Sequence, residues 1–267
     1  MTHEPYPYQA FTLPDGQRLA YIDAGRGPAL LLMHGFAGTA TSHFDELIGA
    51  WLSRYRVIAP DLRGYGRSQP APRHLHAGFY AQDARDMVAL LDQLGVARVV
   101  VLGFSDGGES ALLLAARAPE RVRAVVAWGV SGVISAAMLE GVETWLPARQ
   151  WTDERAAWRD EIVRLHGAHQ FPALVEGWVA AAQALHARGG DICRDEAAEI
   201  RCPALLINGD GETGNLPEDL HRLASRIPAA TVRLVRESGH AVHRDQPTTF
   251  QRTVEDYLLG VSGDREV

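Results

Sequence analysis

The chain has 267 residues, of which 46% are hydrophobic and 22% charged, and its formal net charge is -7. These values are typical of a folded globular protein, and the length fits one large domain or one domain with an insertion. All 26 basic residues are arginine and they form no basic stripe. We therefore expect no nucleic-acid partner, and lysine Schiff-base chemistry is excluded.

Targeting signals and cysteines give further expectations. The N-terminal segment shows no basic stretch followed by an apolar run, so we expect no secretory signal. No apolar run reaches the ~18 residues of a membrane span. Cys193 and Cys202 lack the spacing of metal ligands and are expected to be reduced thiols. We expect a cytoplasmic protein with no membrane partner, either a monomer or a homodimer.

The first half of the chain predicts an alternation of strands and helices. A hairpin is expected over residues 8–25 around Pro14-Asp15-Gly16, where proline and glycine favour a turn. Continuous apolar runs predict strands that are buried on both faces, and an amphipathic pattern that stops at Gly95 predicts a helix. The runs lie at 29–33, 55–61, 98–103 and 122–130, and the helices at 80–95 and 109–118. This order predicts an α/β fold with a mostly parallel sheet and helices on both faces.

The pattern changes at residue 131. Residues 131–198 show no clear strand, and four of the six tryptophans lie there. Strand and helix patterns return at 202–209, 217–227, 230–238 and 247–260. We therefore predict a core domain made of residues 1–130 and 199–267, with residues 131–198 inserted as a helical cap.

A candidate nucleophile lies between a predicted strand and a predicted helix. Ser105 stands in the pattern Gly103-Phe104-Ser105-Asp106-Gly107. Glycines on both sides allow the sharp turn that exposes a serine hydroxyl at the end of a strand. A serine hydroxyl is a weak nucleophile, so it needs a base, an orienting acid and donors for an oxyanion. The alternative is a serine that only caps the following helix.

Histidines and acids follow the last two predicted strands. His240 comes first after the final strand, beside a glycine, and is the candidate base; His243 is its nearest competitor. Asp210 and Glu212 both follow the preceding strand as candidate acids. Most of the 11 histidines are expected at the surface. Four of them are spaced like metal-ligand pairs, but we expect no metal there: His74, His76, His166 and His169.

The order serine, acid, histidine resembles the α/β-hydrolase superfamily. The resemblance extends over the chain and includes His34-Gly35 and the segment "DLRGYGRS" at 61–68. It implies an α/β-hydrolase fold, a catalytic triad of Ser105, Glu212 and His240, and no cofactor. Similar proteins usually carry aspartate where Glu212 stands, so the identity of the acid stays open. Glu212 is favoured over Asp210.

The resemblance also implies an oxyanion hole formed by the backbone N–H groups of Phe36 and Asp106. His34 is expected to pack under its loop, and Asp61, Arg63 and Ser68 are expected to fix theirs by hydrogen bonds, although an arginine near the site could contact substrate.

Two interpretations of the Asp106 side chain stay open. The elbow "GFSDGG" resembles that of the valacyclovir hydrolase and biphenyl hydrolase-like group, which implies that the carboxylate binds a substrate ammonium. The alternative is that Asp106 pairs with an arginine or with backbone donors at the start of its helix. Trp145 and Trp178, together with Phe171, are expected either to line an apolar substrate pocket or to form the core of the cap.

The leading functional hypothesis is a serine esterase with a small-molecule ester substrate, and the elbow favours α-amino acid esters. Cofactor-free haloperoxidase or perhydrolase activity, carbon–carbon bond hydrolysis and acyl transfer use similar triads and stay open. A small-molecule receptor that keeps a hydrolase fold is the alternative from another class.

Overall fold

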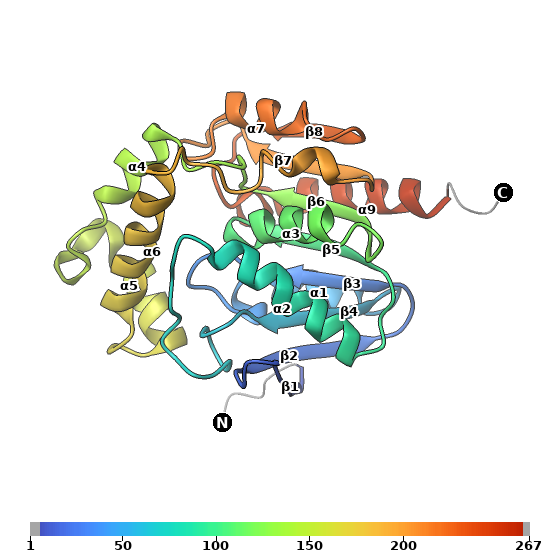
Figure 1. The fold of residues 1–267 in the computed structure, drawn as a ribbon, viewed down its shortest axis with the longest axis horizontal. Coiled ribbons are helices and arrows are strands. Elements are labelled where there is room, and N and C mark those ends of the chain that lie inside the picture. Colours follow the sequence, from blue (N-terminus) through green and yellow to red (C-terminus); the bar gives the residue numbers. More distant parts are fainter. Residues whose placement is uncertain (1–5, 264–267) are drawn as a thin grey trace.

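A computed structural model describes residues 6–263 as one eight-stranded sheet with helices on both faces (Figure 1). The strand order is β1-β2-β4-β3-β5-β6-β7-β8. The strands are β1 (Tyr8–Thr12), β2 (Arg18–Gly25), β3 (Ala29–Met33), β4 (Arg56–Asp61), β5 (Val99–Phe104), β6 (Val122–Trp128), β7 (Ala204–Gly209) and β8 (Ala230–Val235). β2 pairs antiparallel with β1 and β4, and all other pairs are parallel, so the predicted mostly parallel sheet is confirmed.

The helices divide between two layers and one end of the sheet. They are α1 (Ala40–Trp51), α2 (Phe79–Gln93), α3 (Asp106–Arg117), α4 (Ala136–Glu143), α5 (Asp153–His166), α6 (Phe171–His186), α7 (Pro217–Ala224), α8 (Val242–Asp245) and α9 (Pro247–Gly263), with short 3-10 turns at Ala148–Gln150 and Ala197–Glu199. Side chains of α1 and α9 pack in one apolar cluster, and those of α2, α3 and α7 pack in the other. The sheet lies between the two clusters.

The central strands are apolar throughout because both of their faces are covered. Along β3, Leu30 and Leu32 face the cluster of α1 and α9, whereas Leu31 and Met33 face that of α2 and α3. All four side chains have 0% exposure. This burial explains why the sequence shows a continuous apolar run instead of alternation.

The helix α1 was not predicted. Its N-terminus carries a capping box in which Ser42 N–H donates to Thr39 Oγ1 and Thr39 N–H donates to Ser42 Oγ. The usual sequence signature has glutamate or glutamine at the third helical position, and serine there weakens the signal. Phe44, Ile48 and Trp51 then pack on the sheet.

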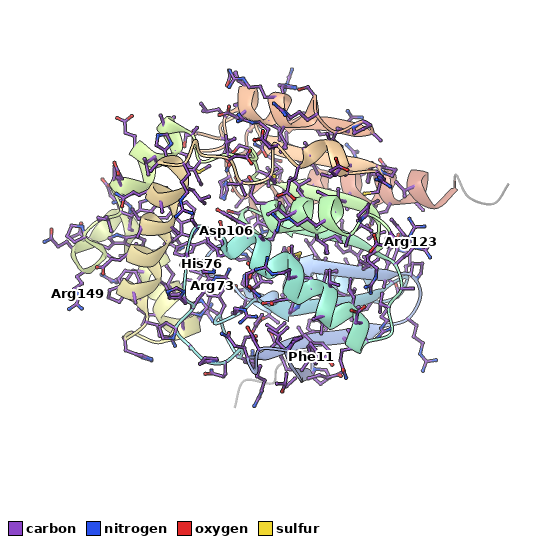
Figure 2. All side chains as sticks on the ribbon, viewed as in Figure 1. Phe11, Arg73, His76, Asp106, Arg123 and Arg149 are labelled. Carbon is purple, nitrogen blue, oxygen red and sulfur yellow. The ribbon has the colours of Figure 1, made fainter. Side chains whose placement is uncertain are left out.

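The segment between β6 and β7 contributes the cap helices, which we define as α4, α5 and α6. Figure 1 shows them stacked at one end of the sheet, and in Figure 2 Asp106 lies at the sheet end that faces them. The two ends of this segment are joined at its base, where Ile134 N–H donates to Gly190 O over 2.7 Å and Ile192 N–H donates to Gly132 O over 2.9 Å. The helical insertion expected in the fold is therefore present.

Two other sequence expectations can be compared with the structure. Between residues 6 and 263, every helix is too short or too polar to span a bilayer. Cys193 and Cys202 are buried free thiols.

The backbone packs very closely where β3, β5 and α3 meet. A Cβ atom built on Gly107 would lie 2.1 Å from Met33 O and 2.5 Å from His34 O. One on Gly103 would lie 2.3 Å from Gly107 O. Glycine at these two positions is what lets the first turn of α3 approach the strand ends.

We expect Gly107→Ala to lower the free energy of unfolding by about 3 kcal/mol or more, with a Tm lower by roughly 6 to 12 °C, because backbone atoms must move to admit the methyl group. Gly260→Ala in α9 is the control, since a Cβ there meets no atom within 4 Å. Thermal unfolding of both variants checks this, and equal Tm values would contradict the packing argument.

Candidate active site

Ser105 occupies the turn between β5 and α3 in a strained conformation. Its φ is 55° and its ψ is -122°, a region that side chains other than glycine rarely adopt. Hydrogen bonds hold the turn on both sides: Ser105 N–H donates to Trp128 O over 2.8 Å, and Gly108 N–H donates to Ser105 O over 2.8 Å. The hydroxyl therefore has a fixed position at the carboxyl end of the sheet.

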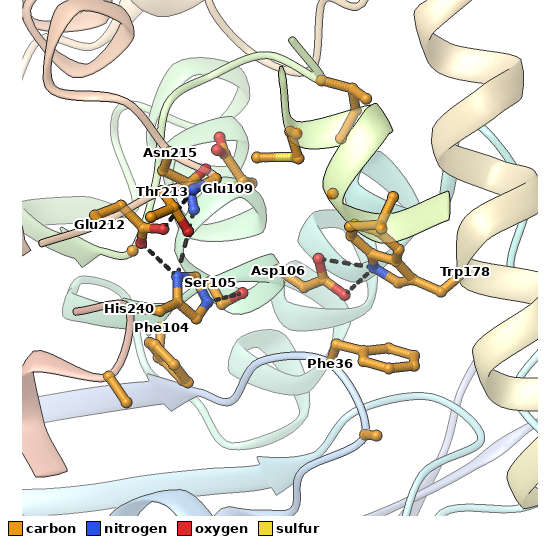
Figure 3. Close-up of a pocket in the computed structure, with 18 of the residues that line it drawn as sticks. Phe36, Phe104, Ser105, Asp106, Glu109, Trp178, Glu212, Thr213, Asn215 and His240 are labelled. Carbon is orange, nitrogen blue, oxygen red and sulfur yellow. Dashed lines mark hydrogen bonds and ion pairs between the residues drawn. The ribbon is translucent and has the colours of Figure 1, made fainter. Parts of the chain in front are cut away.

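The structure brings three of the predicted residues into one hydrogen-bonded chain (Figure 3). His240 Nε2 lies 2.9 Å from Ser105 Oγ, and His240 Nδ1 lies 2.6 Å from Glu212 Oε2. A carboxylate only accepts, so Nδ1–H donates to Glu212, which leaves Nε2 to accept the Ser105 hydroxyl proton. This is the arrangement that turns a serine into a nucleophile.

Glu212, and not Asp210, contacts His240. The Asp210 side chain is exposed, and its backbone N–H continues the pairing with β8 by donating to Val235 O. Glu212 is 8% exposed, and its Oε1 accepts from Gly214 N–H over 2.8 Å. Burial alone would raise the pKa of Glu212, but the hydrogen bond to His240 and the backbone donors outweigh it and lower that pKa to about 2.

The loop after β3 passes directly beside the candidate nucleophile. A Cβ atom on Gly35 would lie 2.9 Å from Ser105 Cβ. Phe36 follows Gly35, and Asp106 follows Ser105 as the first residue of α3. Among the described turns, loops and helix caps, neither backbone N–H of these two residues has a carbonyl acceptor. Both predicted oxyanion donors thus stand next to Ser105 on adjoining segments.

The Asp106 carboxylate has partners that were not predicted. Trp178 Nε1–H donates to Oδ2 over 2.9 Å and to Oδ1 over 3.2 Å, and Tyr80 O–H donates to Oδ1 over 3.0 Å. The proposed arginine or backbone partners are therefore wrong for this side chain, because neutral side chains from α2 and α6 reach it instead. Asp106 is 6% exposed, and burial, opposed in part by Arg73, raises its pKa to about 7.

A pocket of about 460 Å³ opens over Ser105 beneath the cap helices. Trp145 and Trp178 both line it, as predicted for a substrate pocket, whereas Phe171 packs against Trp151 and does not. Phe36, Trp145 and Trp178 form an aromatic wall with ring centroids 5.3 to 6.1 Å apart. The apolar lining also includes Phe104, Ile134, Met138, Val142, Trp158 and Ile192.

The charged lining of this pocket is mostly acidic. It comprises Asp106, Glu109, Glu161, Glu212 and Arg244. Glu109 was missed from the sequence, although it lies three residues after Asp106 on the same side of a helix, a spacing that could have indicated it. Its Oε1 accepts from Ser131 N–H and Gly132 N–H, each over 2.9 Å, and its Oε2 accepts from the Cys193 thiol.

The other candidate histidines take structural positions. His243 is buried, and its Nδ1 accepts from Trp128 Nε1–H over 2.9 Å, so it does not compete with His240. Burial lowers the pKa of His243 to about 3. His34 is fully buried, and its Nε2 accepts from Leu62 N–H over 2.8 Å, as expected for a residue that packs under its loop.

The loop residues after β4 are also structural. Asp61 accepts from Ala40 N–H and Arg67 N–H, and Ser68 Oγ donates to Asp61 O. Arg63 makes a bidentate pair with Asp86 and lies outside the pocket lining, so its suggested contact with substrate is not supported. Within residues 6–263, no three His, Cys, Asp or Glu side chains gather as metal ligands.

Comparisons with known proteins relate the chain to hydrolases. A family model described as "alpha/beta hydrolase fold" matches residues 28–156. The chain is 30% identical over 252 residues to the human protein named serine hydrolase BPHL. The match covers 91% of this chain and 84% of the human one. It is 31% identical over 264 residues to 2-hydroxymuconate semialdehyde hydrolase of Pseudomonas putida, with 92% of each chain covered.

Solved structures show the same fold. A hydrolase from Pseudomonas aeruginosa PA01 superposes with a TM-score of 0.76 at 24% identity, over 96% of this chain and 99% of that one. At this identity the similarity supports the fold only.

The low pKa of Glu212 predicts a pH-dependent contribution to stability. In the unfolded chain the carboxyl group binds a proton near its ordinary pKa of 4.5, whereas the folded state stays ionised down to about 2. Its contribution is therefore full above pH 4.5 and is lost as the pH falls from 4.5 toward 2. We expect the difference in unfolding free energy between wild type and Glu212→Gln to shrink over that range, as measured by urea unfolding. A difference that stays constant would contradict it.

Proposed function

The chain belongs to the α/β-hydrolase family, and from this we propose a serine hydrolase that cleaves carboxylic esters through an acyl-enzyme on Ser105. The observation that carries the proposal is the hydrogen-bonded chain from Glu212 through His240 to Ser105. The distance of 2.9 Å from Ser105 Oγ to His240 Nε2 is short enough for direct proton transfer. The distance of 2.6 Å from His240 Nδ1 to Glu212 Oε2 lets the carboxylate orient the ring.

In the proposed reaction, Ser105 Oγ attacks the ester carbonyl carbon while its proton passes to His240 Nε2. The carbonyl oxygen becomes an oxyanion, which the N–H groups of Phe36 and Asp106 stabilise by about 3 kcal/mol each. His240 then protonates the leaving alcohol, and the C–O bond breaks to leave an acyl-enzyme. A water molecule, deprotonated by His240, attacks the acyl carbon. The bond from that carbon to Ser105 Oγ then breaks, His240 returns the proton to Oγ, and the acid is released. Ionised Glu212 stabilises the imidazolium in both halves.

We further propose that α-amino acid esters are preferred. The Asp106 carboxylate is buried next to Ser105, and in the described part of the chain its side-chain hydrogen-bond donors are neutral, Trp178 and Tyr80. A buried carboxylate without an ion pair is costly, and a substrate ammonium would supply the missing positive charge. The aromatic wall leaves room for an apolar side chain or alcohol on the same substrate.

Carbon–carbon bond hydrolysis on the same triad is the second candidate, because one relative is named as a hydrolase of 2-hydroxymuconate semialdehyde. A muconate carries a carboxylate. The acids in the pocket lining outnumber its one arginine, Arg244, and would repel such a substrate. The charge of the pocket therefore favours the ester.

Labelling by a fluorophosphonate distinguishes an enzyme from a binding protein with the same fold. We expect one adduct on Ser105, and Ser105→Ala and His240→Ala to lower ester turnover roughly 10⁴- to 10⁶-fold, because the triad acts as a unit. Mass spectrometry of the adduct and steady-state rates check this. Absence of an adduct on folded wild type would rule out the proposal.

Glu212→Ala and Asp210→Ala form a matched pair on one loop. Loss of the buried acid is expected to lower kcat about 10³- to 10⁴-fold, whereas loss of the exposed one changes it by about twofold at most. A larger loss from Asp210→Ala would assign the acid to Asp210 instead.

The ammonium preference is tested with Asp106→Asn, which keeps the shape of the side chain. We expect kcat/KM for an amino acid ester to fall about 10- to 100-fold, and that for its N-acylated counterpart to change by about threefold at most. Because the pKa of Asp106 is raised to about 7, the carboxyl group is neutral below that pH and ionised above it. The quotient of wild-type to variant kcat/KM on the amino ester should therefore rise through about pH 7. The ionisation of the substrate cancels in this quotient, and a flat profile would contradict the role.

A further inference from the structure

The end of α5 makes a contact that neither the triad nor the pocket explains. His166 is the last residue of α5, is 6% exposed, and reaches from the cap helices to two loops of the core. Its Nε2 lies 2.8 Å from Ala37 O, and Gly66 N–H donates to its Nδ1 over 3.1 Å. A carbonyl only accepts and an amide N–H only donates, so the ring is neutral, with its proton on Nε2.

Ala37 belongs to the turn that presents the proposed oxyanion donor. Gly38 N–H donates to Gly35 O over 3.2 Å, which closes a four-residue turn with Phe36 and Ala37 at its centre. We call residues 35–38 the oxyanion turn. Ala37 has a φ of 51°, a left-handed conformation that costs an alanine roughly 1 kcal/mol and that glycine adopts freely. The turn therefore needs contacts from outside to keep this shape.

The inserted segment between β6 and β7 supplies contacts to two neighbouring residues of the oxyanion turn. The Phe36 ring packs against Trp145 at 6.1 Å and Trp178 at 5.7 Å between centroids. His166 Nε2–H holds the carbonyl of the next residue, Ala37. The side chain of the donor residue and the carbonyl that follows it are thus both held by the cap.

The two hydrogen bonds of His166 differ in importance. Gly66 lies in a loop that Asp61 already fixes, because Asp61 Oδ2 accepts from Arg67 N–H over 2.9 Å and Asp61 Oδ1 accepts from Ala40 N–H over 2.9 Å. The bond from Gly66 therefore reinforces a segment that is held elsewhere. The bond to Ala37 acts on the strained turn itself.

We propose that His166 is a positioning residue for the oxyanion turn: by holding Ala37 O it fixes the direction of the Phe36 N–H, so that seating of the cap sets the strength of the oxyanion hole. This inference rests on the proposed function. It predicts that loss of the Ala37 bond weakens binding of the transition state more than binding of the ester.

Three variants separate the two bonds of the ring. His166→Phe keeps an aromatic ring and removes the hydrogen bonds to Ala37 and Gly66. His166→Gln places a terminal amide near the position of Nε2, within reach of Ala37 O, whereas His166→Asn reaches only the position of Nδ1 and Gly66. We expect kcat for a neutral ester to fall roughly 10- to 100-fold in the Phe and Asn variants, with KM within about threefold, and to be largely retained in the Gln variant.

Phenylboronic acid is the second readout. Ser105 Oγ bonds to boron while the hydroxyl proton passes to His240, and the tetrahedral anion places an oxygen in the oxyanion hole. We expect its inhibition constant to rise in the Phe and Asn variants by about the factor lost in kcat/KM. Inhibition by the carboxylic acid product, which forms no such adduct, should change by less than about threefold. Tm values for all three variants establish that the proteins are folded.

The outcomes are distinct. Gln and Asn variants that lose equal activity, or boronate and product constants that move together, would overturn the positioning role while Ser105 labelling keeps the proposed function. Wild-type protein that turns over no ester and binds no boronate would overturn the proposed function and this inference with it.

Discussion

The close approach of α3 to the end of β3 is the constraint on which the site depends. Only a glycine at position 107 lets the first turn of α3 lie against the carbonyls of Met33 and His34. That contact fixes the helix start, and the helix start fixes the positive φ of Ser105. The same packing brings Gly35 and the loop after it beside the hydroxyl. The proposed nucleophile and oxyanion donors are therefore positioned by backbone packing, independently of the His240 and Glu212 side chains.

The two carboxylates beside this backbone frame differ in the charge of their partners. Glu212 is buried with a histidine and backbone donors as partners, so it stays ionised. Asp106 is buried with neutral partners, and its ionisation is held back to about pH 7. Two carboxylates that line one pocket thus differ because their surroundings differ. The first suits stabilisation of a charged His240 ring, and the second fits the proposed recognition of a positive group.

The sequence was most informative where the signal is local. Ser105 and His240 each follow an apolar strand beside a glycine, and the structure brings these two predicted residues within 2.9 Å of each other. The choice between Glu212 and Asp210 stayed open because both leave the same strand end, and only the path of the loop decides which one reaches His240. The partners of Asp106 could not be predicted, since Tyr80 and Trp178 lie 26 and 72 residues away in the chain. The role of His166 depends on a loop 129 residues distant.

The paired base of the cap segment has an evolutionary consequence. The chain leaves the core after β6 and returns before β7 at points joined by hydrogen bonds between Ile134 and Gly190 and between Gly132 and Ile192. Because its two ends are paired, the intervening segment can change in length and sequence without displacing β6 and β7. A transplanted segment would, however, have to bring its own replacements for the Trp178 and His166 contacts. Changes in the inserted segment can thus alter the lining of the pocket, while the contacts of Trp178 and His166 constrain that segment to match the core.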